Sequence, residues 1–221
     1  MKTLKTIILM LFAVCLFGQT FAQDYLSDDQ KKFIGRRAAQ KTGQMNNYIS
    51  YMVDEGYSMK EREDYMQSAK DLFLGRAEEY YEEGYWKIVN MQVTSLYNPT
   101  RTYPVKLYFE SLVGLIKRGV YDCAKINTTE IADMQVSTLR HVYGNEYECT
   151  VAYVQTFCGY KDGRPLYCDR TKKNMKCRVY LISDGDGGSE IEVYLSDCHA
   201  TETTRIKPSD ITNGDLLIPD R

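Results

Sequence analysis

Histidine is scarce in this sequence and its cysteines stand far apart. His141 and His199 are the only histidines, and no two of the seven cysteines are near neighbours. Structural zinc sites need ligand pairs separated by about two to four residues. An EF-hand loop starting at Asp184 would have Gly188 at its fifth position and Leu195 at its last, where a glutamate is required. The sequence therefore predicts no metal ion and no cofactor, and a glycine-rich turn at 183–189.

An excess of positive charge and long apolar runs are also missing. The chain has 28 Lys and Arg against 30 Asp and Glu, a net charge of −2. Nucleic-acid-binding proteins normally present a basic face, so nucleic acid is not an expected partner. The strongest apolar run, residues 7–17, is shorter than the roughly 20 apolar residues that a membrane-spanning helix needs. We therefore expect no membrane span.

The first 22 residues have the three parts of a secretory signal peptide. Lys2 and Lys5 precede the apolar run, and small residues lead to Ala22, which predicts cleavage before Gln23. A lipoprotein signal ending at Cys15 is the alternative, and Val14 fits it poorly. We expect a secreted or periplasmic protein of the cell envelope.

Without the signal peptide, 221 − 22 = 199 residues remain, which is the size of one domain with a full core. No linker or internal repeat divides them. The sequence therefore predicts a single domain over residues 23–200. The polar segment 201–221 is expected to be an extended or partly disordered tail.

Apolar residues at helical spacing predict two consecutive helices, which should form a hairpin. Each helix begins with a capping box and ends at a glycine: Ser27 with Gln30 and Gly56 in the first, Ser58 with Glu61 and Gly84 in the second. The residues expected in the core are Phe33, Ala38, Met45, Ile49, Met52 and Val53, followed by Met66, Ala69, Phe73, Ala77 and Tyr80.

The spacing of apolar residues changes after these helices. Residues 85–97 alternate like a strand with one buried face, and Val89, Met91 and Val93 lie on that face. A third helix is predicted over 103–119, with Pro104 in its first turn. From 120 to 200 the chain has the pattern of strands separated by turns. These elements predict an α+β fold in which a helical hairpin and a third helix pack on a mostly antiparallel sheet.

The cysteines at 149, 158, 168 and 177 are spaced symmetrically, since 149 + 177 and 158 + 168 both equal 326. Facing residues of an antiparallel pair have a constant index sum, and their Cα atoms lie about 4.5–5.5 Å apart, within disulfide range. The spacing predicts the bridges Cys158–Cys168 and Cys149–Cys177, on opposite faces of one hairpin because 149 and 158 differ by an odd number. Cys123 and Cys198 are paired by elimination. The alternative is that some of these cysteines are free buried thiols.

The turn of this hairpin requires one adjustment. A two-residue Asp162-Gly163 turn gives an index sum of 325, which places Cys158 opposite Tyr167. A β-bulge on either strand restores the sum of 326. The segment 169–176, DRTKKNMK, is polar for a strand interior, which favours a bulge or an edge position there.

The order of the elements between residues 27 and 199 resembles the nuclear transport factor 2-like superfamily of α+β cones, which includes ketosteroid isomerase. The helix ending in VGLIKRG and the long strands opening with CTVAYVQTF carry this resemblance. It implies a strongly curved sheet that wraps the helices and leaves a pocket at its open end. Isomerases of this superfamily use an Asp base with acidic hydrogen-bond donors. Asp133, Asp169 and the tyrosines could supply such groups, but no family motif matches residue by residue.

The sequence contains no catalytic signature. His141 and His199 have no nucleophile motif beside them, and the Asn127-Thr-Thr pattern is an N-glycosylation acceptor only where a host has that machinery. The 19 tyrosines favour half-exposed sheet positions over a stacking surface, because they are scattered. We therefore expect an exported, disulfide-stabilised binding protein for a glycan, a peptide or an envelope protein. The alternatives are a cone-superfamily enzyme acting on a small apolar substrate and a structural subunit of an envelope assembly.

Overall fold

The computed structural model describes residues 26–183 and 189–206. The chain forms two compact units, residues 1–31 and 32–221, and each is described by itself. In the described part of the first unit, Gln30 N donates to Ser27 Oγ at 3.2 Å and Ser27 N donates to Gln30 Oε1 at 2.8 Å. This is the predicted capping box. The predicted signal peptide lies outside the described residues.

The described residues form three α-helices and two 3₁₀ turns. The α-helices are α2 (Asp28–Val53), α3 (Met59–Lys70) and α4 (Val105–Lys117), and the 3₁₀ turns are η1 (Leu74–Ala77) and η2 (Ile131–Asp133). The capping box of Ser58 and Glu61 begins α3 as predicted. Ile34 is fully buried on α2, whereas Phe33 is 45% exposed, so the apolar face of this helix lies one residue later than predicted at its start. None of these described helices is long and apolar enough to cross a lipid bilayer.

Ten strands make up two sheets in the described part of the chain. They are β1 (Tyr80–Glu82), β2 (Tyr85–Lys87), β3 (Asn90–Val93), β4 (Arg101–Pro104), β5 (Cys123–Thr128), β6 (Gln135–Val136), β7 (Arg140–Tyr143), β8 (Glu146–Lys161), β9 (Arg164–Ser183) and β10 (Ser189–Arg205). The large sheet has the order β4-β3-β10-β9-β8-β5, and β6 and β7 pair with β8. Its pairings are antiparallel except for that of β3 with β10. The chain is therefore an α+β protein with a mostly antiparallel sheet, as predicted.

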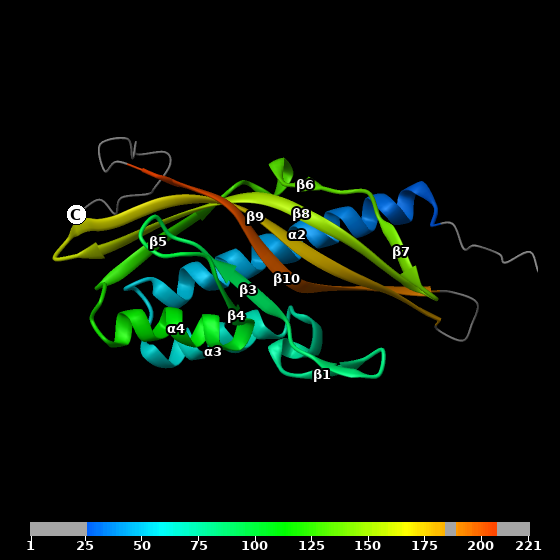
Figure 1. Ribbon diagram of the computed structural model, residues 1–221, viewed down its shortest axis with the longest axis horizontal. Helices are drawn as coiled ribbons and strands as arrows, with labels where there is room; N and C mark the ends of the chain where they lie inside the picture. The colour runs from blue at the N-terminus through cyan, green and yellow to red at the C-terminus, as the bar shows by residue number, and fades with distance from the viewer. Residues whose placement is uncertain (1–25, 184–188, 207–221) are drawn as a thin grey trace, which may run out of the picture. The chain divides into compact units, whose positions relative to one another are not determined.

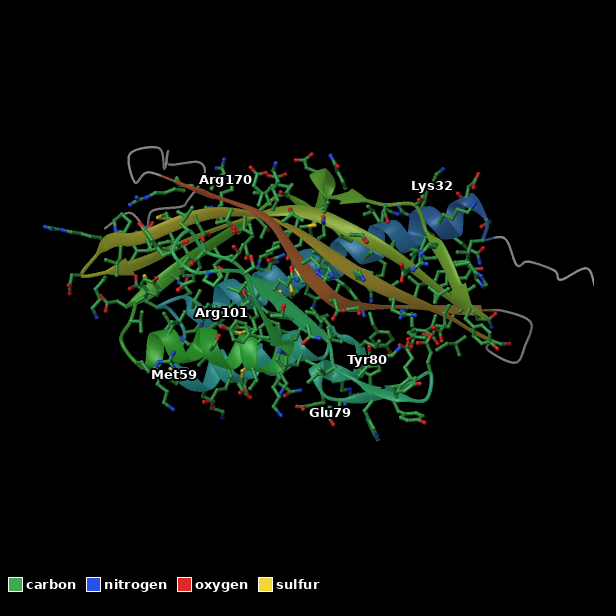
Figure 2. The ribbon with its side chains drawn as sticks, viewed as in Figure 1. Lys32, Met59, Glu79, Tyr80, Arg101 and Arg170 are labelled. Carbon is green, nitrogen blue, oxygen red and sulfur yellow. A yellow bond between two sulfur atoms is a disulfide. The ribbon has the colours of Figure 1, made fainter. Side chains whose placement is uncertain are left out.

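The helices of the second unit cover one face of the large sheet, and the long strands β8, β9 and β10 curve over them (Figure 1). Alternate residues of β8 and β9 are buried on this face, among them Val151 and Tyr153 of β8 and Met175 of β9. Met45 of α2 and Phe109 of α4 are fully buried as well. Figure 2 shows side chains between the helices and the sheet. A curved sheet wrapped around helices agrees with the expected cone-like architecture.

The β8–β9 hairpin has the predicted register and the predicted bulge. Lys161 pairs with Arg164 around a turn in which Asp162 and Gly163 both have positive φ. The register then shifts between Tyr160 and Gly159, so that facing residues beyond this point have index sums of 326. The bulge leaves one residue of β9 unpaired, and it lies next to the turn. Hydrogen bonding on both sides of the bulge thus brings the cysteines into register.

The second helix is shorter than predicted. It ends at Lys70 instead of near Gly84: the backbone is already extended at Phe73, and Gly75, Arg76 and Ala77 then have positive φ. Tertiary contacts favour this ending: Leu195 N donates to the carbonyl of Leu72 at 3.0 Å, and the fully buried Phe73 packs edge-on against Phe109. The chain beyond forms the β1–β2 hairpin, whose turn contains Glu83 and Gly84.

Two further boundaries differ from the predictions. The single strand predicted over 85–97 is divided into β2 and β3, although Val89 and Met91 are fully buried as expected. At the other end, β10 continues through Arg205 and pairs with β9 up to Asp169. The first residues of the predicted tail are therefore part of the sheet, and residues 207–221 lie outside the described chain.

Candidate functional site

A cavity of about 200 Å³ lies between α4 and the face of the sheet that the helices cover. Aromatic and apolar side chains make up most of its wall: Tyr108, Leu112, Leu115, Tyr121, Phe157 and Tyr167. Val93 at the end of β3 and the following Thr94 and Ser95 close one side. Such a concave, largely apolar space with a few polar groups is typical of small-molecule sites.

Strand β9 supplies the polar floor of the cavity. Tyr167, Asp169, Thr171 and Lys173 all line it, because alternate residues of a strand point to the same face. The residues between them face the other way, and Arg170, labelled in Figure 2, is exposed. β9 lies between β8 and β10 and is hydrogen-bonded on both sides. The segment 169–176 is therefore not an edge strand, but its pairing with β10 has the register shifts expected of bulges, one of them between the partners of Lys173 and Lys172. The polar residues of this segment that line the cavity form its floor.

Asp169 and Tyr167 form the central polar contact of the cavity. Tyr167 Oη donates to Asp169 Oδ2 at 2.6 Å, and the backbone N–H of Leu96 donates to Tyr167 Oη at 3.2 Å. Burial raises the pKa of Asp169, against the opposing effects of the Tyr167 hydrogen bond and the charge of Lys173. Burial and the hydrogen bond to Asp169 together raise the pKa of Tyr167 to about 12. The pair can thus hold a proton between two oxygens in a poorly hydrated place.

Lys173 brings a positive charge into the same cavity. Its side chain is only 5% exposed, and its Nζ lies 5.7 Å from the centre of the Tyr108 ring. Burial raises the pKa of Tyr108, so this phenol stays neutral beside the ammonium group. Thr171, between Asp169 and Lys173 on the floor, shares a hydrogen bond of 2.9 Å with Thr203 of β10. The floor thus has a carboxyl group near one end and an ammonium group near the other.

A buried hydrogen-bond chain connects the cavity to α2. Gln155 Nε2, on the cavity wall, donates to Asn46 Oδ1 at 2.8 Å. Asn46 Nδ2 in turn donates to the backbone carbonyl of Thr42 at 2.9 Å. Nearby, Tyr153 Oη and Cys198 Sγ are 3.7 Å apart. These contacts satisfy polar groups that would otherwise be costly to bury, and they fix α2 against β8.

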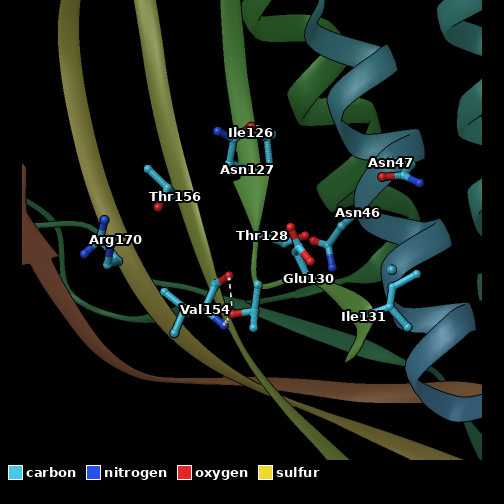
Figure 3. Close-up of a pocket in the computed structure, with 12 residues that line it drawn as sticks. Asn46, Asn47, Ile126, Asn127, Thr128, Glu130, Ile131, Val154, Thr156 and Arg170 are labelled. Atoms are coloured by element: carbon cyan, nitrogen blue, oxygen red, sulfur yellow. Dashed lines mark hydrogen bonds between the residues drawn. The ribbon is translucent and has the colours of Figure 1, made fainter. Parts of the chain in front are cut away.

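A second, wider groove of about 670 Å³ lies on the other side of Asn46 (Figure 3). Asn46 and Asn47 of α2 face strand residues across it, among them Asn127 and Thr156. Its rim also carries the exposed side chains of Glu130 and Arg170, labelled in Figure 3. The groove is mostly polar, and it includes the Asn127 of the glycosylation pattern.

The cysteines of the hairpin face each other as the index sum predicts. Cys158 and Cys168 form a disulfide with their Cα atoms 4.2 Å apart, and Tyr160 and Ile206 pack against it. Cys149 and Cys177 also lie directly opposite each other, but they are free thiols in this structure. A hydrogen bond from Cys177 lowers the pKa of Cys149, while this bond and burial raise that of Cys177. The second bridge stays a prediction.

The structure does not bring Cys123 and Cys198 together. Cys123 lies in β5 and Cys198 in β10, with β8 and β9 between them in the sheet. Adjacent strands are about 4.8 Å apart, so three spacings separate these thiols by far more than a disulfide allows. Both are buried and free. Pairing by elimination was therefore wrong, because it ignored strand order.

The other candidate residues are dispersed. Asp133 is exposed in η2, so Asp169 is the one of the two predicted aspartates that lines the cavity. His141 is exposed, with its Nε2 2.7 Å from the carbonyl oxygen of Gly144. His199 is half-buried in β10, opposite Asn174. In the described part of the chain, no group of three His, Cys, Asp or Glu side chains is placed to hold a metal ion.

Three residues of the site, Lys173, Tyr167 and Gln155, were not predicted from the sequence. The signal that could have indicated two of them is the alternation of polar residues at 167–173, which places Tyr, Asp, Thr and Lys on one face of a strand. Gln155 carries no such signal, because the residues around it on β8 alternate between the two faces of the sheet like those of any strand.

Comparison with known proteins assigns no family. No protein-family model and no curated protein matches the chain. One similar solved structure is the crystal structure named "Putative Scytalone Dehydratase" from Novosphingobium aromaticivorans DSM 12444. The similarity has a TM-score of 0.38 and 14% sequence identity, and covers 81% of this chain and 92% of that one. A TM-score below 0.5 is too low to transfer a fold family or a function.

Proposed function

We propose that this protein binds a small, mostly apolar organic molecule in the cavity between α4 and the sheet. The observation that carries the proposal is a part-buried Asp169–Tyr167 hydrogen bond set among aromatic and apolar walls. Apolar walls supply affinity through burial, and a few fixed polar groups supply orientation. The proposed ligand is therefore a small molecule, in place of the glycan, peptide or envelope protein expected from the sequence.

The size of the cavity favours a small ligand over a polymer. Its volume of about 200 Å³ is below the roughly 300–1,000 Å³ of sites for drug-sized molecules. A peptide or a glycan chain would need an open groove with many hydrogen-bonding groups along it. The wider groove beside Asn46 is polar enough for such a ligand, but it lacks the aromatic side chains on which sugar rings stack.

We also propose that the protein acts outside the cytoplasm. The Cys158–Cys168 disulfide is compatible with that location, because disulfides persist in oxidising compartments. The export signal predicted over residues 1–22 would deliver the chain there. Amino-terminal sequencing of the protein from its source tests this, with Gln23 as the expected first residue.

A cavity-filling substitution tests the binding proposal. Leu115→Trp on α4 should fill the cavity, and it should abolish binding of single-ring compounds detected by saturation-transfer NMR in the wild type. Leu107→Trp is the matched control, because Leu107 lies on the same helix and is 49% exposed. Binding that survives Leu115→Trp at wild-type strength would place the ligand elsewhere.

Proton-transfer catalysis is the second candidate function. The observation that favours it is the raised pKa of the buried Asp169, which brings a carboxyl group nearer to the range useful for general acid–base catalysis. Tyr167, hydrogen-bonded to it, could supply a second proton site. Asp169→Asn distinguishes the two functions: an enzyme would lose turnover and keep ligand binding, whereas a binding protein has no turnover to lose.

A further inference from the structure

Lys173 is a buried cation without an anionic partner. No carboxylate oxygen of the described residues lies within 4.0 Å of its Nζ. Its neighbour Lys172, on the opposite face of β9, is 64% exposed and pairs with Glu202 at 2.7 Å. The buried lysine thus has no counter-charge of the kind that its exposed neighbour has.

An isolated ammonium group is costly to bury, because it loses its hydration without a compensating charge. The Tyr108 ring, 5.7 Å from Nζ, compensates only part of this cost through a cation–π contact. Asp169 forms no ion pair with Lys173 within 4.0 Å, although the charge of Lys173 acts on it from a distance and lowers its pKa. Asp169 already accepts a hydrogen bond from Tyr167.

Since Lys173 lines the cavity, a ligand there can supply the missing counter-charge. We infer that the ligand carries a carboxylate or a similar organic anion bound by Lys173, attached to one ring that packs against the Tyr121, Phe157 and Leu112 wall. This inference rests on the proposed binding function and names the class of ligand.

The volume sets the size of the apolar part. A cavity of about 150 Å³ lined by apolar side chains is large enough for benzene. A volume of about 200 Å³ therefore holds one ring and a short chain, but not a fused polycyclic skeleton. The predicted ligand is a single-ring carboxylate of the size of 3-phenylpropanoate.

The test compares 3-phenylpropanoate with 3-phenylpropanamide, which has nearly the same shape and no charge. Isothermal titration calorimetry at pH 7 should show that wild-type protein binds the carboxylate roughly tenfold more tightly than the amide, as is typical for a charge-assisted hydrogen bond. Lys173→Met should reduce this ratio to near one, and Lys173→Arg should preserve most of it. Lys172→Met is the matched control and should keep the wild-type ratio.

The outcomes separate this inference from the proposed function. Equal binding of both compounds to the wild type would overturn the anion inference and leave the cavity as a binding site. An unchanged ratio in Lys173→Met would also overturn it, since the charge would then be recognised elsewhere. Failure of the wild type to bind either compound would contradict the proposed function itself. If Lys173→Met does not fold, the anion inference is judged from the ratio of carboxylate to amide affinity in the wild type and in Lys173→Arg.

Discussion

Tyr167 and Asp169, two residues apart on the same face of β9, are joined by a hydrogen bond of 2.6 Å inside the cavity. Successive residues on one face of a strand are about 6.8 Å apart, so the tyrosine must lean along the strand to reach the carboxylate. The backbone N–H of Leu96 holds its hydroxyl group from the other side. This arrangement makes a buried carboxyl group tolerable and leaves it facing the cavity.

Removing the Tyr167 hydroxyl group should destabilise the fold and move the titration of Asp169. Tyr167→Phe leaves the buried carboxylate without its donor, which should lower the free energy of unfolding by about 1–3 kcal/mol. Because this hydrogen bond lowers the pKa of Asp169, its loss should raise that pKa further. Urea denaturation and an NMR titration of the Asp169 carboxyl group measure the two effects. Tyr143→Phe, at a side chain 79% exposed, should change neither.

Asp169 should make the protein less stable as the pH rises. Its pKa is raised in the folded state by burial, so the folded protein keeps a proton that the unfolded chain releases. The free energy of unfolding should therefore fall, by at most about 1.4 kcal/mol per pH unit, as the pH rises from the ordinary aspartate value of 3.8 through the raised one.

Asp169→Asn removes this titration, so the stability of the variant relative to the wild type should improve over the same pH range. The exposed Asp64→Asn on α3 is the control and should show no such trend. Urea denaturation at a series of pH values measures both variants. If the free energy of unfolding changed with pH in the same way in Asp169→Asn and in the wild type, Asp169 would not be the group that makes stability depend on pH.

Breaking the Cys158–Cys168 bridge should leave one additional free thiol and reduce the stability of the fold. The bridge closes a loop with a sequence separation of 10, which corresponds to about 2–3 kcal/mol in the chain-entropy account. Cys158→Ser should leave Cys168 as an additional free thiol, counted with a thiol reagent after denaturation without reductant, and reduce the urea midpoint accordingly. Cys123→Ser changes a cysteine that is free in this structure and serves as the control. If both variants had the same number of reactive thiols, the bridge would be absent in solution.

Cys149 and Cys177 should form a second bridge under oxidising conditions. They face each other across β8 and β9, so oxidation joins them without a change of strand register. Treatment with oxidised glutathione, which accepts the two electrons, should produce a peptide containing the Cys149–Cys177 link after protease digestion. Mass spectrometry detects this peptide. Cys123 and Cys198 should remain thiols in the same sample, and a link between them would contradict the strand order.

The hairpin could be predicted from the sequence because its interactions are local. A two-residue turn at Asp162 and Gly163, one bulge and a constant index sum determine which residues face each other. The capping box of Ser58 and Glu61 is local for the same reason, since all its hydrogen bonds lie within four residues. The sequence by itself therefore determined the start of this helix, the register of the long strands and the α+β class.

Only the tertiary structure decided where α3 ends, which cysteines stay apart and where the site lies. Contacts of Leu72 and Phe73 with distant residues outweigh the helical pattern that continues to residue 80. The cavity combines residues 93–95, α4, β8 and β9, and no local spacing shows that these segments converge. The polar stretch of β9 was visible in the sequence, but whether it faces solvent or a cavity depends on helix α4, more than fifty residues earlier. Such long-range packing follows from burial of the whole chain and cannot be read from neighbouring residues.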